Sequence, residues 1–211
     1  MIRSMLRSPY HCIAAVMIVG TLISFLPARE ATRADGAKFT AMVPKSVPAA
    51  AGEAAYPAET VQRGKYLVSV LGCNDCHTPW KMSENGPEPD MSRMLSGHPS
   101  DLNMPPASAL QGPWVWQASG TNTAFAGPWG VSYTFNLTPD VNTGLGIWTE
   151  EMFMGAIRTG KHFGQSRPIN PPMPWPAYRN LTDPDLKAVY AYLRTIPPVK
   201  NLVPDYEPPV K

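Results

Sequence analysis

The sequence predicts an all-α domain in which about three helices are joined by long irregular loops. Three segments carry apolar residues at helical spacing or helix-capping signals, at residues 59–72, 148–160 and 181–199. No segment alternates apolar and polar residues convincingly over the length of a strand. The chain also contains 25 prolines among its 211 residues, a proportion that favours long loops.

The segment before these helices is predicted to be an export signal over residues 1–34. Arg3 and Arg7 precede an uncharged, mostly apolar run from Ile13 to Leu26, and small residues follow where a signal would be cut. The run is shorter than the roughly 20 residues that span a bilayer. We therefore expect cleavage, with retention as a membrane anchor as the alternative. Losing four arginines and one glutamate takes the formal net charge from +2 to −1, and no basic patch points to nucleic acid.

The rest of the chain divides into a flexible linker over residues 35–57, one domain over residues 58–200 and an extended tail over residues 201–211. Small residues and proline dominate the linker, and prolines punctuate the tail. Within the domain, an irregular insert over residues 78–147 is rich in Pro, Gly, Asn and Ser. A loop of that length needs something to order it, and its tryptophans are the candidate anchors. The insert contains Trp80, Trp114, Trp116 and Trp129.

The first predicted helix, at residues 59–72, has a glycine in its apolar stripe. Val61, Gly64, Val68 and Leu71 fall on one face at helical spacing. Glycine is costly inside a helix, so Gly64 indicates a place where another backbone comes very close.

The two later helices carry capping signals. Thr149 is predicted to cap the second helix at its start, and Gly160 fits its end. Thr182 is predicted to cap the last helix, with Asp185 three residues later. Apolar residues then recur along one face of the last helix, at Leu186, Val189, Tyr190, Leu193 and Ile196.

The stretch LGCNDCHTPW contains Cys73 and Cys76, three positions apart, with His77 directly after the second. A zinc site needs two more Cys or His ligands at suitable spacing, whereas His98 and His162 are isolated in the sequence. A redox dithiol of the thioredoxin kind needs a βαβ setting, which the helical pattern does not offer. A plain disulfide stays open but leaves the histidine unexplained.

A covalently attached haem c accounts for all three residues at once. Each thiol adds to one vinyl group, and the two-residue spacer places both sulfurs along one edge of the porphyrin. His77 is then held beneath the iron as an axial ligand. Because Cys12 lies in the predicted signal, the two motif cysteines are the only ones expected in the mature chain.

Four stretches resemble the single-haem, all-helical c-type cytochromes of bacteria. They are RGKYLVSVLGCNDCHTP, NLTPDVNTGLGIWTEEMFMGAIRTG, PINPPMPWPAYRNLTD and PDLKAVYAYLRTIPPV. The second and third look like segments of cytochrome c subunits that serve periplasmic dehydrogenases. The resemblance implies a cytochrome c fold, with about three main helices around one haem. In that fold the first and last helices cross, which would set Gly64 against Tyr190 or Tyr192.

The resemblance also implies a methionine on the far side of the iron, in a loop before the last helix. Met173 lies in such a loop, and three prolines stiffen the backbone around it. His162 is the main competitor for this position, and His98 is a weaker one. As in relatives, Trp175 or Tyr178 could bond a haem propionate, and Pro79 could offer a carbonyl that orients the proximal imidazole. Arg167 could pair with a propionate or have only a surface role.

An iron with both axial positions filled would transfer single electrons, and no acid, base or nucleophile constellation is apparent elsewhere in the sequence. We therefore expect a periplasmic electron carrier, not itself an enzyme, that exchanges electrons with a dehydrogenase donor and with an oxidase or another cytochrome as acceptor. The alternative is a haem enzyme, or a catalytic subunit of a multi-haem oxidoreductase, whose sixth iron position opens. We also expect residues around 105–130 to fold over one haem edge, as a shield or a docking face.

Overall fold

The computed structural model describes residues 56–209, all within one compact unit. The predicted signal over residues 1–34 and nearly all of the linker lie outside the described residues. The helices are α1 (Ala58–Val70), α2 (Cys73–His77), α3 (Glu150–Thr159), α4 (Trp175–Tyr178) and α5 (Asp183–Thr195), with three 3-10 turns, η1 (Met91–Arg93), η2 (Leu145–Ile147) and η3 (His162–Gly164). The strands are β1 (Trp80–Ser83), β2 (Gly86–Pro89), β3 (Gln117–Ala118), β4 (Ala124–Gly127) and β5 (Gly130–Tyr133). None of the described helices has the length and hydrophobicity needed to cross a bilayer.

The helices α1 and α5 cross at Gly64, as the sequence predicted. A Cβ atom at this position would lie 1.9 Å from the Ala188 carbonyl oxygen and 2.8 Å from the Cβ of Tyr192. Only a residue without a side chain allows this approach. Tyr192, rather than Tyr190, is therefore the tyrosine at the crossing. The buried hydroxyl of Tyr190 instead donates a hydrogen bond to the Trp148 carbonyl.

The predicted caps of the later helices are confirmed. The Thr149 side chain accepts a hydrogen bond from the Met152 amide at the start of α3, and Gly160 ends that helix in a left-handed conformation. The Thr182 side chain accepts from the Asp185 amide at the start of α5. These local interactions therefore determine where both helices start.

The hydrophobic core lies mainly among α1, α3 and α5. Its residues come from both ends of the domain and from the insert. Because these distant segments share one core, the domain forms one unit. The core residues are Leu67, Val68, Leu95, Leu145, Trp148, Phe153, Ala156, Ile157, Leu186, Ala188, Val189, Tyr190, Leu193 and Ile196.

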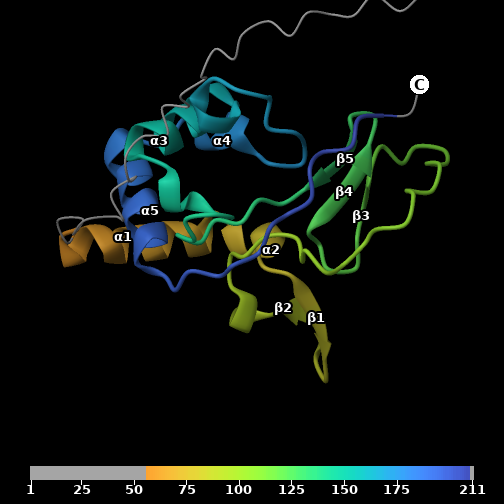
Figure 1. Ribbon diagram of the computed structural model, residues 1–211, viewed down its shortest axis with the longest axis horizontal. Helices are drawn as coiled ribbons and strands as arrows, with labels where there is room; N and C mark the ends of the chain where they lie inside the picture. Colours follow the sequence, from red (N-terminus) through yellow and green to blue (C-terminus); the bar gives the residue numbers. More distant parts are fainter. Residues whose placement is uncertain (1–55, 210–211) are drawn as a thin grey trace, which may run out of the picture. The chain divides into compact units, whose positions relative to one another are not determined.

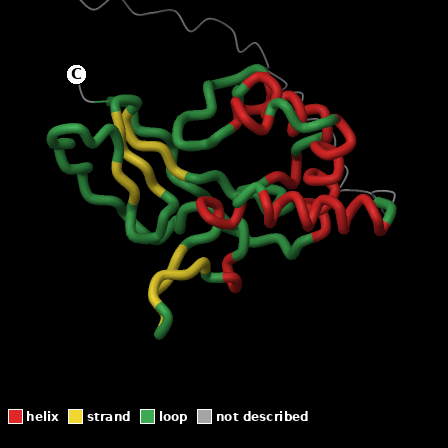
Figure 2. Tube along the Cα trace, turned by 180° about the vertical axis from the view of Figure 1, so that it is seen from behind, coloured by secondary structure: helices red, strands yellow, loops and turns green. Residues whose placement is uncertain are grey.

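The expectation of a purely all-α domain is wrong in one region, because the insert contains two small antiparallel sheets. The first is the β1–β2 hairpin, in which Trp80 pairs with Pro89. The second has the order β3–β4–β5, and Gly127 pairs with Gly130 at its turn. Figure 2 shows the two sheets as separate yellow groups beside the red helices. The strands are two to four residues long and rich in Gly and Pro, so no alternating pattern could develop in the sequence.

The C-terminal segment after α5 runs back across the insert. Glu207 forms an antiparallel bridge with Val131 of β5, and Figure 1 shows this blue segment beside the green strands. Asn201 anchors its start: its side-chain amide donates to the backbone oxygens of Ser96 and His98 and accepts from the Ser100 amide.

Candidate functional site

The short helix α2 gathers the three motif residues on one face. Cys73 and Cys76 are separated by three positions and Cys73 and His77 by four, the spacings at which helical side chains become neighbours. Gly72 precedes the helix with a φ of 69°, which lets the chain turn sharply out of α1. Both cysteines are free thiols.

The imidazole of His77 is oriented by a backbone carbonyl of the insert. Its Nδ1 lies 2.7 Å from the carbonyl oxygen of Phe135. A carbonyl can only accept, so Nδ1 carries the proton and Nε2 keeps its lone pair for a metal. Burial lowers the pKa of His77, which favours the neutral form that metal ligation needs.

The carbonyl of Pro79, predicted for this role, does something else. It accepts a hydrogen bond from the Asp90 amide, which closes the β1–β2 hairpin at its base. The structure thus gives the orienting role to Phe135, fifty-eight positions from His77.

A cavity of about 720 Å³ opens beside the motif. Cys73, Cys76 and His77 line it together with Met173. In Figure 1, α2 lies below α4, and the two short helices belong to different parts of the fold. Most of the wall is apolar. The apolar lining includes Leu71, Phe135, Leu137, Leu145, Trp148, Phe153, Ala156, Ile157, Ile169, Leu181, Leu186, Val189 and Leu193. Its size and lining are those of a site for a large, mostly apolar group.

Burial keeps the two thiols protonated. The pKa of Cys73 is raised to about 12, chiefly by desolvation, and the pKa of Cys76 is raised by the same cause. Among residues 56–209, no group of three or more His, Cys, Asp or Glu side chains comes together as a candidate metal site.

Two polar atoms of the cavity wall are buried and lack a hydrogen-bond partner within the described part of the chain. They are Nε2 of His162 and Oγ1 of Thr134. A buried polar atom without a partner costs about 1–3 kcal/mol, so such atoms indicate a ligand with polar groups of its own. A haem, with an apolar ring and two carboxylates, fits both the apolar wall and these two atoms.

The three residues predicted as partners of a haem propionate do not all line the cavity. Tyr178 lines the cavity, but its hydroxyl donates to the Leu71 carbonyl beside the cysteine motif. Trp175 does not line the cavity, because its indole packs against Gly160 at the end of α3. Arg167 does line it.

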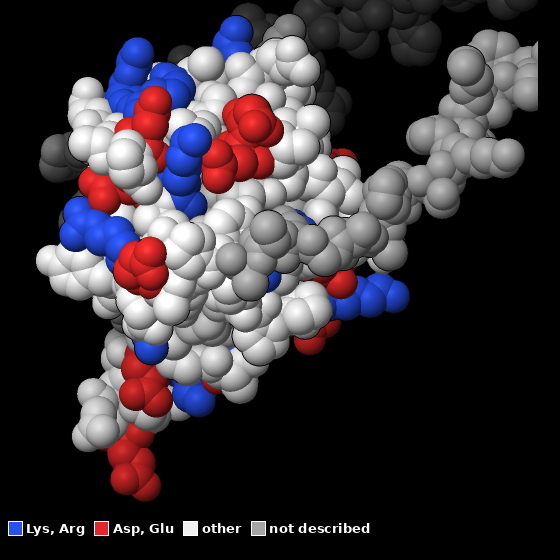
Figure 3. Space-filling model, turned by 90° about the vertical axis from the view of Figure 1, so that its left-hand side faces the viewer, with Lys and Arg blue, Asp and Glu red and all other residues white. Residues whose placement is uncertain are grey.

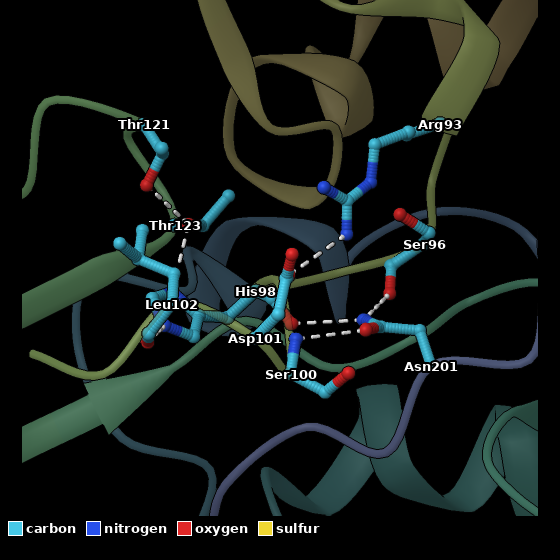
Figure 4. Close-up of polar contacts among 9 residues, drawn as sticks. All are labelled: Arg93, Ser96, His98, Ser100, Asp101, Leu102, Thr121, Thr123 and Asn201. Carbon is cyan, nitrogen blue, oxygen red and sulfur yellow. Dashed lines mark hydrogen bonds and ion pairs between the residues drawn. The ribbon is translucent and has the colours of Figure 1, made fainter.

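His98, the weaker competitor for the iron, lies outside the cavity wall. The residue is fully buried, its Nε2 lies 3.0 Å from the Leu102 carbonyl and its Nδ1 lies 2.9 Å from the Thr123 hydroxyl. Figure 4 shows this imidazole in a network that also includes Asn201. Both ring nitrogens are therefore already used, and His98 has a structural role.

Residues around 105–130 were expected to fold over one edge of the haem, and only some of them line the cavity. Of the later tryptophans of the insert, Trp116 lines the cavity, whereas Trp114 and Trp129 do not. Residues of the C-terminal segment also line it, from Leu202 to Tyr206. No sequence pattern indicates this part of the wall, since it depends on where Asn201 and Glu207 attach.

The comparisons with known proteins agree with this geometry. No family model matches the chain. The chain is 36% identical over 88 residues to a subunit of nicotinate dehydrogenase from Pseudomonas putida, a match that covers 42% of this chain and 7% of that protein. It is 30% identical over 136 residues to the fructose dehydrogenase cytochrome subunit of Gluconobacter japonicus, covering 64% of this chain and 21% of the relative. The chain is similar to cytochrome subunits of dehydrogenases.

A further cytochrome relative is the gluconate 2-dehydrogenase cytochrome c subunit of Pantoea cypripedii, 28% identical over 150 residues, with 71% of this chain and 26% of the relative covered. The chain thus spans about a quarter or less of the length of the relatives that it matches. The similarity to cytochrome subunits agrees with the Cys-x-x-Cys-His motif.

Proposed function

We propose that this chain is a periplasmic electron-transfer protein with one covalently attached haem c, ligated by His77 and Met173. The observation that carries the proposal is the convergence of Cys73, Cys76, His77 and Met173 on one apolar cavity of about 720 Å³. The names of the cytochrome relatives support an electron-transfer role. The single Cys-x-x-Cys-His motif in the sequence supports one haem.

Each residue has a distinct task in this proposal. Cys73 and Cys76 would hold the haem covalently, since the sulfur and hydrogen of each thiol would add across one vinyl double bond without net oxidation or reduction. His77 offers Nε2 to the iron while Phe135 holds Nδ1. Met173 offers its thioether from a loop stiffened by prolines. When bound, the haem supplies an iron that alternates between Fe(II) and Fe(III).

The cavity wall tunes this chemistry. Its apolar side chains exclude water and disfavour the additional charge of Fe(III), which raises the reduction potential. His162 and Thr134, with their unpartnered polar atoms, are the residues that would bond the haem carboxylates. Arg167 contributes a positive charge at the same cavity.

We further propose that the electron donor is a dehydrogenase and that the acceptor is an oxidase or another cytochrome. The dehydrogenase names of the relatives support such a donor. The arginine-led apolar run near the N-terminus supports export to the periplasm, where haem c is attached.

The test is to express the full chain in a host that exports proteins and attaches haem c. We expect a coloured protein that keeps its haem after denaturation, with a low-spin spectrum and the near-infrared band of methionine bound to ferric iron. Met173→Ala should abolish that band and let carbon monoxide bind the reduced protein. Met152→Ala, at an exposed methionine of α3, should leave both properties unchanged.

Two results would contradict parts of the proposal. Colourless protein from a competent host would exclude covalent haem. Rapid carbon monoxide binding by the unaltered protein would instead favour the haem enzyme with an open sixth position.

A further inference from the structure

A long part of the insert carries no charge. Between Asp101 and Asp140 the sequence contains no Asp, Glu, Lys or Arg. Within this stretch, three consecutive apolar residues are exposed to solvent: Trp114 by 74%, Val115 by 60% and Trp116 by 45%. We call these three residues the tryptophan edge. Adjacent exposed apolar side chains of this size are typical of an interaction surface.

The loop that carries the tryptophan edge is tied at its base. The side chain of Gln117 donates a hydrogen bond to the Ser108 carbonyl, and Gln117 also pairs with Ala126 in the sheet. The loop encloses a hollow of about 670 Å³ lined by residues between Ala109 and Ala118. Trp114 therefore lies within the loop that the Gln117–Ser108 hydrogen bond closes.

The tryptophan edge is continuous with the cavity proposed for haem. Trp116 belongs to both, since it is partly exposed and also lines the cavity. Its ring packs edge-on against Phe125, at 5.8 Å between centroids, and the buried Phe125 lines the cavity as well. A protein bound at the tryptophan edge would therefore lie next to the cavity.

Paired charges lie on the helical side of the molecule. Figure 3 shows basic and acidic side chains beside one another on the side where α1 and α5 lie. Ion pairs there include Arg63 with Asp185 and Lys187 with Glu150. In Figure 1 the sheet β3–β5 and its connecting loop lie at the other end of the described unit. The three residues of the tryptophan edge carry no charge, so a contact made there would be held by apolar burial rather than by ion pairs.

We propose that the tryptophan edge is the docking face for the dehydrogenase that reduces this chain, and that this dehydrogenase presents an uncharged, apolar recess to it. The proposal rests on the proposed function and names the place and chemistry of its partner contact. Trp114 fills the recess, because exposed tryptophans are over-represented among the residues that dominate binding. The complex is held by apolar burial and is insensitive to salt.

The experiment uses the tagged, haem-loaded full chain made in its native cells. The dehydrogenase that co-purifies is identified by mass spectrometry and by its reduction of the haem when its own substrate is added. Hydroxyl-radical footprinting should show rapid oxidation of Trp114 in the free protein and strong protection in the complex. Stopped-flow absorbance then gives the rate of haem reduction at a low, fixed concentration of dehydrogenase.

Three variants make the test specific. Trp114→Ser should slow haem reduction by about tenfold or more, as expected for a dominant binding residue. Val115→Lys should also slow it, because an unpaired charge would enter an apolar contact. Met82→Ser, at a 77% exposed methionine of β1, should keep the wild-type rate. The wild-type rate should change by less than about twofold between low and high salt, since the contact at the tryptophan edge contains no ion pair.

Several outcomes would overturn the docking proposal. Co-purification of no dehydrogenase, a wild-type rate in Trp114→Ser, or a steep loss of rate with salt would each do so. Protection of Trp114 in the free protein would mean that a second copy or another segment of this chain covers the edge, which also contradicts it. Absence of haem from the purified chain would overturn the proposed function itself, so the two failures are distinguishable.

Discussion

Single contacts between distant residues determine how the candidate site is arranged. The carbonyl of Phe135 selects the His77 tautomer with a free Nε2. The Nε2 of His162 and the Oγ1 of Thr134 are buried polar atoms without a partner in a mostly apolar wall. None of these three roles follows from residue type alone, because each depends on which groups the fold leaves paired.

Substituting His162 tests the proposed hydrogen bond between its imidazole and a haem carboxylate. His162→Phe removes the N–H donor, leaves negative charge uncompensated near the iron and so favours Fe(III). We expect the midpoint potential to fall by roughly tens of millivolts, since 59 mV corresponds to tenfold for a one-electron couple. His162→Gln keeps an N–H and should restore most of the potential in a spectroelectrochemical titration. Loss of the methionine-to-iron band in His162→Phe would argue against this role.

His98 should make stability depend on pH. Burial lowers its pKa in the folded protein, whereas the unfolded chain titrates near the ordinary value of about 6.5. The unfolded state therefore binds more protons below that pH, so stability is full above about pH 6.5 and falls as the solution becomes more acidic.

The expected change can be measured by urea unfolding of the haem-loaded protein between about pH 7.5 and about pH 5, a range that brackets the ordinary histidine pKa. His98→Gln should reduce the slope of stability against pH by up to about 1.4 kcal/mol per pH unit, the value for one proton. An identical slope in the variant would show that His98 does not titrate differently on unfolding.

At the scale of elements, the three longer helices α1, α3 and α5 were predictable, whereas the short helices α2 and α4 and the strands were not. Gly64, Thr149 and Thr182 act through local geometry, namely a close approach and two caps, so their roles are visible in the sequence. The strands of the insert are held by pairing and by tertiary contacts. One example is the Trp80 amide, which donates to the Thr121 carbonyl. Such contacts leave no periodic pattern in strands as short as these.

The α1–α5 crossing should tolerate no side chain at Gly64. Gly64→Ala would force a Cβ to within 1.9 Å of the Ala188 carbonyl, so the helices must separate. We expect a loss of about 3 kcal/mol, at the upper end for overpacked cores. Gly120→Ala is the matched control, because a Cβ at Gly120 meets nothing within 4 Å. Equal unfolding midpoints for the two variants would contradict the close crossing.

At the scale of the whole molecule, the cavity is assembled from segments spread over most of the described chain. Its wall runs from Leu71 next to the motif to Tyr206 in the C-terminal segment. The sequence predicted the motif and the methionine loop, because they are local. It did not predict the C-terminal wall, because Asn201 attaches it through three hydrogen bonds to residues about a hundred positions earlier.

Replacing Asn201 should therefore affect both stability and access to the cavity. Asn201→Ala leaves the buried carbonyls of Ser96 and His98 without their donor, at a cost of about 2 kcal/mol or more. The loosened segment should let azide reach the ferric iron faster. Urea unfolding and azide-binding kinetics measure the two effects, with exposed Asn103→Ala as the control. Unchanged azide access would separate the Asn201 anchor from the cavity wall.

The C-terminal wall also constrains the order of biogenesis. In the proposed export, residues 202–206 would leave the ribosome and the export channel well after the motif at residues 73–77. The proposed haem could therefore react with Cys73 and Cys76 before residues 202–206 complete this side of the cavity. If attachment occurred during secretion, the cavity would still be open on this side. In a completely folded apo-chain, the segment that Asn201 anchors would first have to move away from the cavity.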